Sequence, residues 1–121
     1  MATLLVNTGK AVTTARIKGT GTEPSYVAYG TGAGTTALTD TTLFTETGTR
    51  VSGTSSQVTT TTTNDTYQVV GTQTAGGTLA ITNAGLFDAA TVGNLFVKGD
   101  FTTINLSTGD SIQFTFKTQF S

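Results

Sequence analysis

The segment SIQFTFKTQF, residues 111–120, alternates apolar and polar side chains along its length. The apolar side chains share one face, and they are Ile112, Phe114, Phe116 and Phe120. A period of two over this length predicts a β-strand with one buried face, because a helix would scatter these residues around its axis. We expect three of these phenylalanines to be buried, so that Phe114→Ala costs about 3–5 kcal/mol of stability.

Working back from this strand, turn signals divide the chain into further short strands. Apolar runs at 95–97 and 86–87 flank the loop DAATVGN and predict a hairpin, and residues 101–106 lead to a turn at 107–110. Gly76-Gly77 predicts a turn into a strand at 78–81. A short apolar run at 26–29 ends at Gly30, and the glycine-rich residues 30–49 predict a long loop.

Two other segments also suggest strands. Residues 11–18 alternate, with Ala11, Thr13, Ala15 and Ile17 on one face, and glycines follow at 19 and 21. Residues 50–63 and 66–74 predict a hairpin around Asn64-Asp65, since both residues tolerate a positive φ. In that register Thr62 faces Tyr67, Thr60 faces Val69 and Val58 faces Gly71, and the run Thr59–Thr63 forms an exposed strand.

Composition supports an all-β fold. The 121 residues include 32 Thr, 9 Val and 4 Ile, and β-branched side chains fit a pleated sheet better than a helix. Seven or eight short strands separated by turns predict a single-domain antiparallel β-sandwich, either jelly-roll or immunoglobulin-like. We assign residues 1–10 to an N-terminal arm or edge strand and residues 11–121 to the sandwich.

The chain offers little for catalysis or cofactor binding. It has no His and no Cys, so the usual general base, the thiol nucleophile and the commonest metal ligands are missing. Its seven acidic residues are scattered among turn residues, where they commonly bond their own backbone. We therefore expect no enzyme activity, no catalytic residue, no metal site and no cofactor.

Charge and hydropathy also limit the classes of binding partner that we expect. Only 11% of the residues are charged and the net charge is −1, which argues against a nucleic-acid partner because phosphate binding needs a basic patch. No apolar run is long enough to span a membrane, and residues 1–10 lack the features of a signal peptide. A charge-poor surface suits a protein held in an assembly.

Three longer segments resemble a family of small virion proteins of tailed bacteriophages. They are YVAYGTGAGTTALTDTTLFTETGTRVSG, NDTYQVVGTQTAGGTLAITNAGLFDAATVGNLFVKGDF and INLSTGDSIQFTFKT, within residues 26–118. The most distinctive part is AGLFDAA with the following GNLF and DF, although Lys98 stands where the family more often has Arg. Some members are head decoration or cement proteins and others are attached to tails, so the resemblance implies a structural role without catalytic residues.

From the residues and the resemblance together we expect a capsid decoration (cement) protein on the exterior of the virion. It would bind the major capsid protein and itself, as a homotrimer at a local threefold axis. The expected contact residues are the apolar group Leu4, Leu5 and Val6, which has no evident place in the sandwich, and the basic residues Lys10, Arg16 and Lys18. Deleting residues 2–9 should then spare folding and abolish binding to the head.

Two alternatives remain open at this point. One is a structural component of a tail, collar or fibre, which the sequence does not separate from a head protein. The other is a carbohydrate-binding module that would use Tyr26, Tyr29 and Tyr67, since the chain has no Trp.

Overall fold

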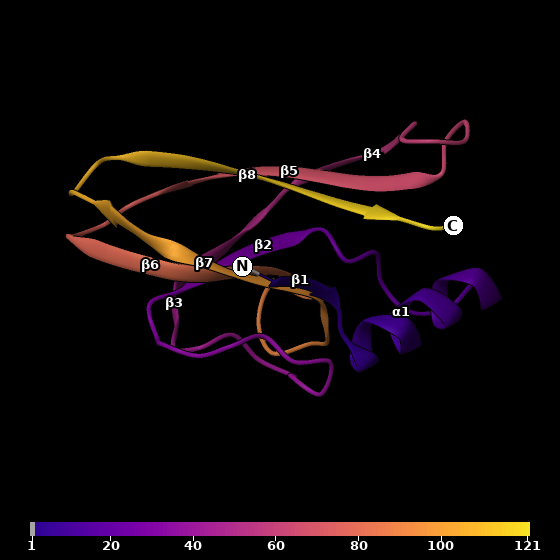
Figure 1. The fold of residues 1–121 in the computed structure, drawn as a ribbon, viewed down its shortest axis with the longest axis horizontal. Coiled ribbons are helices and arrows are strands. Elements are labelled where there is room, and N and C mark those ends of the chain that lie inside the picture. Colours follow the sequence, from indigo (N-terminus) through magenta and orange to yellow (C-terminus); the bar gives the residue numbers. More distant parts are fainter. Residues whose placement is uncertain (1) are drawn as a thin grey trace.

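The computed structural model describes residues 2–121, in which two antiparallel sheets pack face to face (Figure 1). The predicted all-β sandwich is thereby confirmed. The larger sheet has the strand order β1-β7-β6-β2-β3 and the smaller one has the order β4-β5-β8. The larger sheet consists of β1 (Ala2–Leu5), β2 (Tyr26–Gly30), β3 (Glu46–Ser52), β6 (Leu79–Phe87) and β7 (Leu95–Leu106). The smaller sheet consists of β4 (Thr54–Val58), β5 (Thr66–Thr74) and β8 (Ser111–Gln119).

The central part of the five-stranded sheet, around β2, β6 and the first half of β7, is buried on both faces. Its inner face packs on the smaller sheet, where Val27, Leu86 and Val97 meet Val69 and Phe116. Its outer face carries a second apolar cluster around Val6, Phe87 and Leu95, which Leu43 of the loop at 31–45 helps to cover. This explains why β2 and β6 read as nearly continuous apolar runs, since a strand buried on both faces needs no polar side. The predicted hairpin between β6 and β7 is confirmed.

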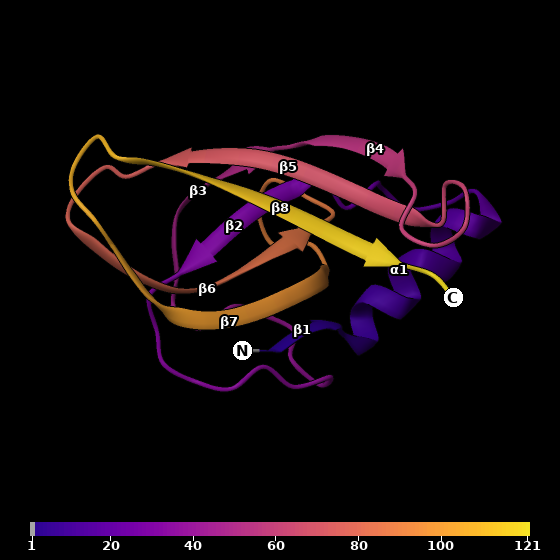
Figure 2. The same cartoon turned by 45° about the horizontal axis from the view of Figure 1, so that its top comes forward.

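Residues 11–18 form a helix, so the predicted strand is wrong. Helix α1 (Asn7–Lys18) lies at the end of the sandwich where β8 ends (Figure 2). Its buried residues Gly9 and Val12 are three apart, which places both on one helical face. Gly19 ends the helix in the left-handed conformation, with φ of 93°, and the N–H groups of Gly19 and Thr20 bond the carbonyls of Arg16 and Ala15. This short helix could not cross a membrane, and no other helix occurs in residues 2–121.

The hairpin between β4 and β5 exists, but its predicted register is wrong. Val58 pairs with Thr66, and the run Thr59–Thr63 lies in a loop rather than in a strand. The carboxylate of Asp65 accepts the backbone N–H groups of Thr60, Thr61 and Thr62 at 2.8–3.0 Å. These bonds replace the ladder bonds that a longer hairpin would have made, so local turn chemistry overrides the strand propensity of threonine.

The predicted strand at the C-terminal end is confirmed as β8, but its phenylalanines are less buried than expected. Phe116 is buried, Phe114 is half-buried, and Phe120 lies beyond the strand with 47% of its surface exposed. The expectation of three buried phenylalanines is therefore wrong. The reason is that β8 is an edge strand, so its inner face is covered by the larger sheet on one side only.

This burial order changes the loss of stability that we expect when each aromatic ring is removed. We expect Phe114→Ala to lower the free energy of unfolding by about 1–2 kcal/mol, because only part of its surface leaves water on folding. The exposed Phe120→Ala should change it by no more than about 0.5 kcal/mol. Urea unfolding of the two variants measures both values, and equal losses would contradict the burial order.

Candidate functional site

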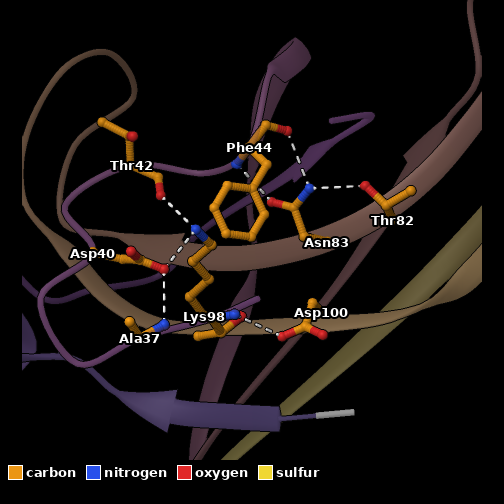
Figure 3. A network of polar contacts seen from close by, with 9 residues as sticks. Ala37, Asp40, Thr42, Phe44, Thr82, Asn83, Lys98 and Asp100 are labelled. Atoms are coloured by element: carbon orange, nitrogen blue, oxygen red, sulfur yellow. Dashed lines mark hydrogen bonds and ion pairs between the residues drawn. The ribbon is translucent and has the colours of Figure 1, made fainter. Parts of the chain in front are cut away.

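A network of polar side chains lies under the loop at 31–45, on the outer face of the larger sheet (Figure 3). Its centre is Lys98 of β7, whose side chain is fully buried. The Lys98 Nζ donates to Asp40 Oδ2 and to the Thr42 carbonyl oxygen, both at 2.9 Å, and lies 3.3 Å from the centre of the Phe44 ring. The buried charge is thus balanced by a carboxylate, a carbonyl dipole and an aromatic face.

Three further side chains hold the same loop on the sheet. The Asn83 amide accepts the N–H of Phe44 at 3.0 Å and donates to its carbonyl oxygen at 3.1 Å, so it pairs with the backbone as a strand would. Asp100 Oδ1 accepts the N–H of Thr36 at 3.0 Å. Thr82 donates to the carbonyl oxygen of Gly32. The loop at 31–45 is therefore held as a fixed cover over the second core.

The electrostatics of this network favour an ion pair. The Ala37 N–H and the Lys98 ammonium both stabilise the Asp40 carboxylate, and they hold its pKa below the usual 3.8. Lys98 has no solvent-accessible surface, and its ammonium is occupied by the groups around it. It is therefore unavailable as a nucleophile or a base, and its role is to fasten the loop.

A second cation fastens the loop between β6 and β7. The Arg50 guanidinium makes two bonds to the Glu46 carboxylate, at 2.8 and 3.0 Å. It also donates to the carbonyl oxygens of Ala89 and Val92 and stacks 3.6 Å from the centre of the Phe87 ring. The Arg50 guanidinium is thus used in contacts within the fold, as the Lys98 ammonium is.

The carboxylates mostly serve turns, as the sequence predicts. Asp65, Asp88 and Asp110 each accept backbone N–H groups of their own turns. Backbone N–H groups stabilise the charged form of Asp65 and lower its pKa. Among residues 2–121 no group of three or more acidic, His or Cys side chains is placed to hold a metal ion.

An open apolar groove lies between helix α1 and the end of the smaller sheet, with a volume of about 410 Å³. We call it the end groove. Its floor includes Val12, Tyr67 and Phe96, and its rim includes Ile17, which is 81% exposed, and Phe120. The Tyr67 hydroxyl donates to the Pro24 carbonyl oxygen at 3.1 Å, and burial raises the pKa of that hydroxyl.

The expected basic contact residues all lie on helix α1, and Arg16 is the one among them that lines the groove. Lys10, Arg16 and Lys18 are all exposed on α1, and the helix contains no acidic residue. They make half of the six basic residues of the chain, so α1 carries a net positive charge, and Glu23 lines the groove beside Arg16. The sequence analysis placed Arg16 and Lys18 in a strand and Lys10 in the N-terminal arm, whereas the structure has all three on one helix.

The expected apolar contact residues lie elsewhere. Leu4 and Leu5 belong to β1, which pairs with β7, and Leu5 packs against the inner core. Val6 has no exposed surface and belongs to the outer cluster. The expectation that these residues have no place in the sandwich is wrong, and Val6 is not available to a partner in this fold. Deleting residues 2–9 would remove a strand, and the boundary drawn after residue 10 falls inside α1.

The three tyrosines do not form the open aromatic surface that a sugar would stack on. Tyr29 is 4% exposed, Tyr67 is half-buried with its hydroxyl bonded inward, and Tyr26 is half-buried against the outer cluster. Among the described residues these three rings therefore form no exposed surface for stacking on a sugar.

The candidate contact surface is thus the end groove with the exposed cations of α1. Comparison of the chain with protein-family models, curated proteins and solved structures finds no match.

Proposed function

We propose that the chain is a non-enzymatic structural protein that decorates the outside of a bacteriophage capsid and binds its coat subunits through the end groove and the exposed face of α1. One observation carries the binding part of this proposal. Exposed apolar side chains and three exposed cations are gathered at one end of the sandwich, whereas Arg50 and Lys98 are tied up inside the fold. The capsid as the partner rests on the resemblance to phage virion proteins.

The fold suits such a role. The loop at 31–45 and the loop at 88–94 are both fastened by cations with several partners, so little conformational freedom remains to be lost when a partner binds. A protein that binds only the assembled shell stabilises it by mass action, and many copies on one shell add up to a large effect. The partner surface should be apolar with acidic neighbours, to match Ile17 and the cations of α1.

The copy number of this chain in purified particles of the phage that encodes it tests the proposal. We expect a number comparable to that of the coat protein, measured by quantitative mass spectrometry. A copy number far below it would place the protein in the tail or collar, and its absence from the particles would end the proposal.

Charge reversal on α1 tests the docking surface itself. Lys18→Glu should weaken binding to heads that lack the protein, measured by co-sedimentation, because it places a negative charge in a surface that needs a positive one. Lys117→Glu makes the same change of charge on β8, outside the helix, and serves as the control. Equal binding of the two variants would argue against α1 as the contact.

A further inference from the structure

On one side of the sandwich both sheets end in unpaired strands. Strand β8 pairs with β5 along residues 111–119, and among residues 2–121 no strand lies on its other edge. In the larger sheet, β1 pairs with β7 only over residues 97–100, so residues 101–106 form a free edge within that same described part of the chain. The turn at 107–110 joins these two edges. We call this side of the molecule the open side.

Apolar side chains are partly exposed to solvent between the two edges. Phe101 of β7 and Phe114 of β8 are both half-buried, with ring centres 6.4 Å apart, and Ile104 is 39% exposed. A groove of about 350 Å³ runs beside them, lined by Thr3 and Gly99 on the larger sheet and by Phe114 and Phe116 on β8. The core of the sandwich is therefore only partly covered along this side.

The open side lacks the usual protection of a sheet edge. Exposed edges are generally blocked by charges, proline or bulges, because their free N–H and C=O groups pair with other chains. Strand β8 has Lys117 as its one charged residue and contains no proline, and its pairing with β5 has no register shift. Residues 101–106 carry no charge.

We propose that the open side pairs with the open side of a second copy, with the two β8 strands antiparallel about a twofold axis close to Gln113. The two smaller sheets would then form one six-stranded sheet. Antiparallel pairing keeps the apolar faces of both strands in the same layer, so that Ile112 of each copy lies opposite Phe114 of the other.

Three features favour a second copy over a different partner. The edge is almost neutral, so it has no charge pattern by which to select another protein. The surface matches itself under a twofold rotation, since apolar meets apolar and polar meets polar. Around Gln113 the edge at 101–106 is not extended by β1, so both layers of two copies can approach together, and the Lys117 side chains stay apart.

This pairing differs from the trimer expected from the sequence. A closed trimer needs contacts between two different surfaces of each copy, whereas the open side complements itself and gives a dimer. The inference does not depend on the capsid proposal, because the dimer can be measured on the purified chain alone.

The test is the mass of the full chain in solution, by light scattering after gel filtration and by sedimentation equilibrium over a range of concentrations. We expect the wild type to reach twice its monomer mass of 12.4 kDa. Gln113→Lys and Gln113→Glu should each weaken the dimer roughly fivefold or more, because like charges would lie directly opposite each other. An equimolar mixture of the two variants should restore it.

Thr72→Lys is the matched control. Thr72 is exposed and lies beside Gln113 on the central strand β5, so the substitution adds the same charge one strand away from the axis. Thr115→Lys offers a second charge on the β8 edge if a variant at 113 fails to fold. A wild type that stays monomeric, a trimer, or a dimer that Gln113→Lys weakens no more than Thr72→Lys would each overturn the proposal.

Discussion

Asp40→Ala is expected to lower the free energy of unfolding by about 3–5 kcal/mol, measured by urea denaturation at neutral pH. The Asp40 side chain itself is partly exposed, so the cost does not come from lost burial. It comes from Lys98, whose fully buried ammonium would lose the one carboxylate that it contacts within residues 2–121 and keep one carbonyl oxygen and the Phe44 ring. A buried charge without its counter-ion is far more costly than the pair is stabilising.

Asp110→Ala is the matched control for this prediction. Asp110 also accepts a backbone N–H of its own turn, that of Ser107 at 2.8 Å, but within the described part of the chain it makes no salt bridge. Its replacement should cost about 1 kcal/mol, the usual value for a lost cap. The double variant Asp40→Ala with Lys98→Met removes both charges and should be more stable than Asp40→Ala alone. Equal losses for Asp40→Ala and Asp110→Ala would refute the role given to Lys98.

The same pair predicts a dependence on pH. Because the pKa of Asp40 is lower in the folded state than its usual 3.8, protons bind the unfolded chain more readily. The stability from this carboxylate is therefore fully present above about pH 4 and is lost as the pH falls through the folded pKa. The wild type should approach Asp40→Ala in stability below that range, and a constant difference between them would contradict the lowered pKa.

The sequence predicted best where neighbouring residues determine the structure. Strand β8 and the hairpin of β6 and β7 follow from alternation and turn residues over short spans, and the structure has both. The prediction of a strand at 59–63 was wrong for a local reason. The carboxylate of Asp65 accepts three backbone N–H groups and closes a loop.

The sequence analysis did not predict helix α1, because residues 11–17 also fit the period of two that is expected of a strand. Ala11, Thr13, Ala15 and Ile17 alternate, yet Ile17 is 81% exposed and the buried positions are Gly9 and Val12. The available signal was the end of the segment, where Arg16 and Lys18 precede Gly19 as at many helix C-termini. Strand propensity was overridden by a tertiary contact between Gly9 and β7 that a sequence pattern cannot show.

The Lys98 network could not be predicted from the sequence either. Lys98 and Asp40 are 58 residues apart, and nothing in the spacing joins them. One indication was present, because Lys98 directly follows the apolar run at 95–97 in a strand that is buried on both faces. A charged residue in such a run predicts a buried partner, but which of the seven acidic residues it is depends on the path of the loop at 31–45.

The contact that holds α1 against β7 leads to the second large prediction. Alanine in place of glycine usually stabilises a helix by about 1 kcal/mol. At Gly9 we expect the opposite sign, with a net loss of about 2–3 kcal/mol. A Cβ at this position would lie 2.0 Å from the carbonyl oxygen of Phe96 and 2.8 Å from the Leu5 Cδ1, so the helix would have to move away from the sheet.

Thr14→Ala on the exposed face of α1 is the control, because it also introduces alanine into the helix without touching the sheet. It should be neutral or stabilise the protein by up to about 0.5 kcal/mol. Thermal and urea unfolding of Gly9→Ala and Thr14→Ala therefore separate helix propensity from packing. If both variants were stabilised, α1 would not rest on β7 at Gly9. The opposite signs expected here would show that α1 rests on β7 through a close approach of the two backbones at Gly9, and this contact also positions the cations of the proposed docking surface.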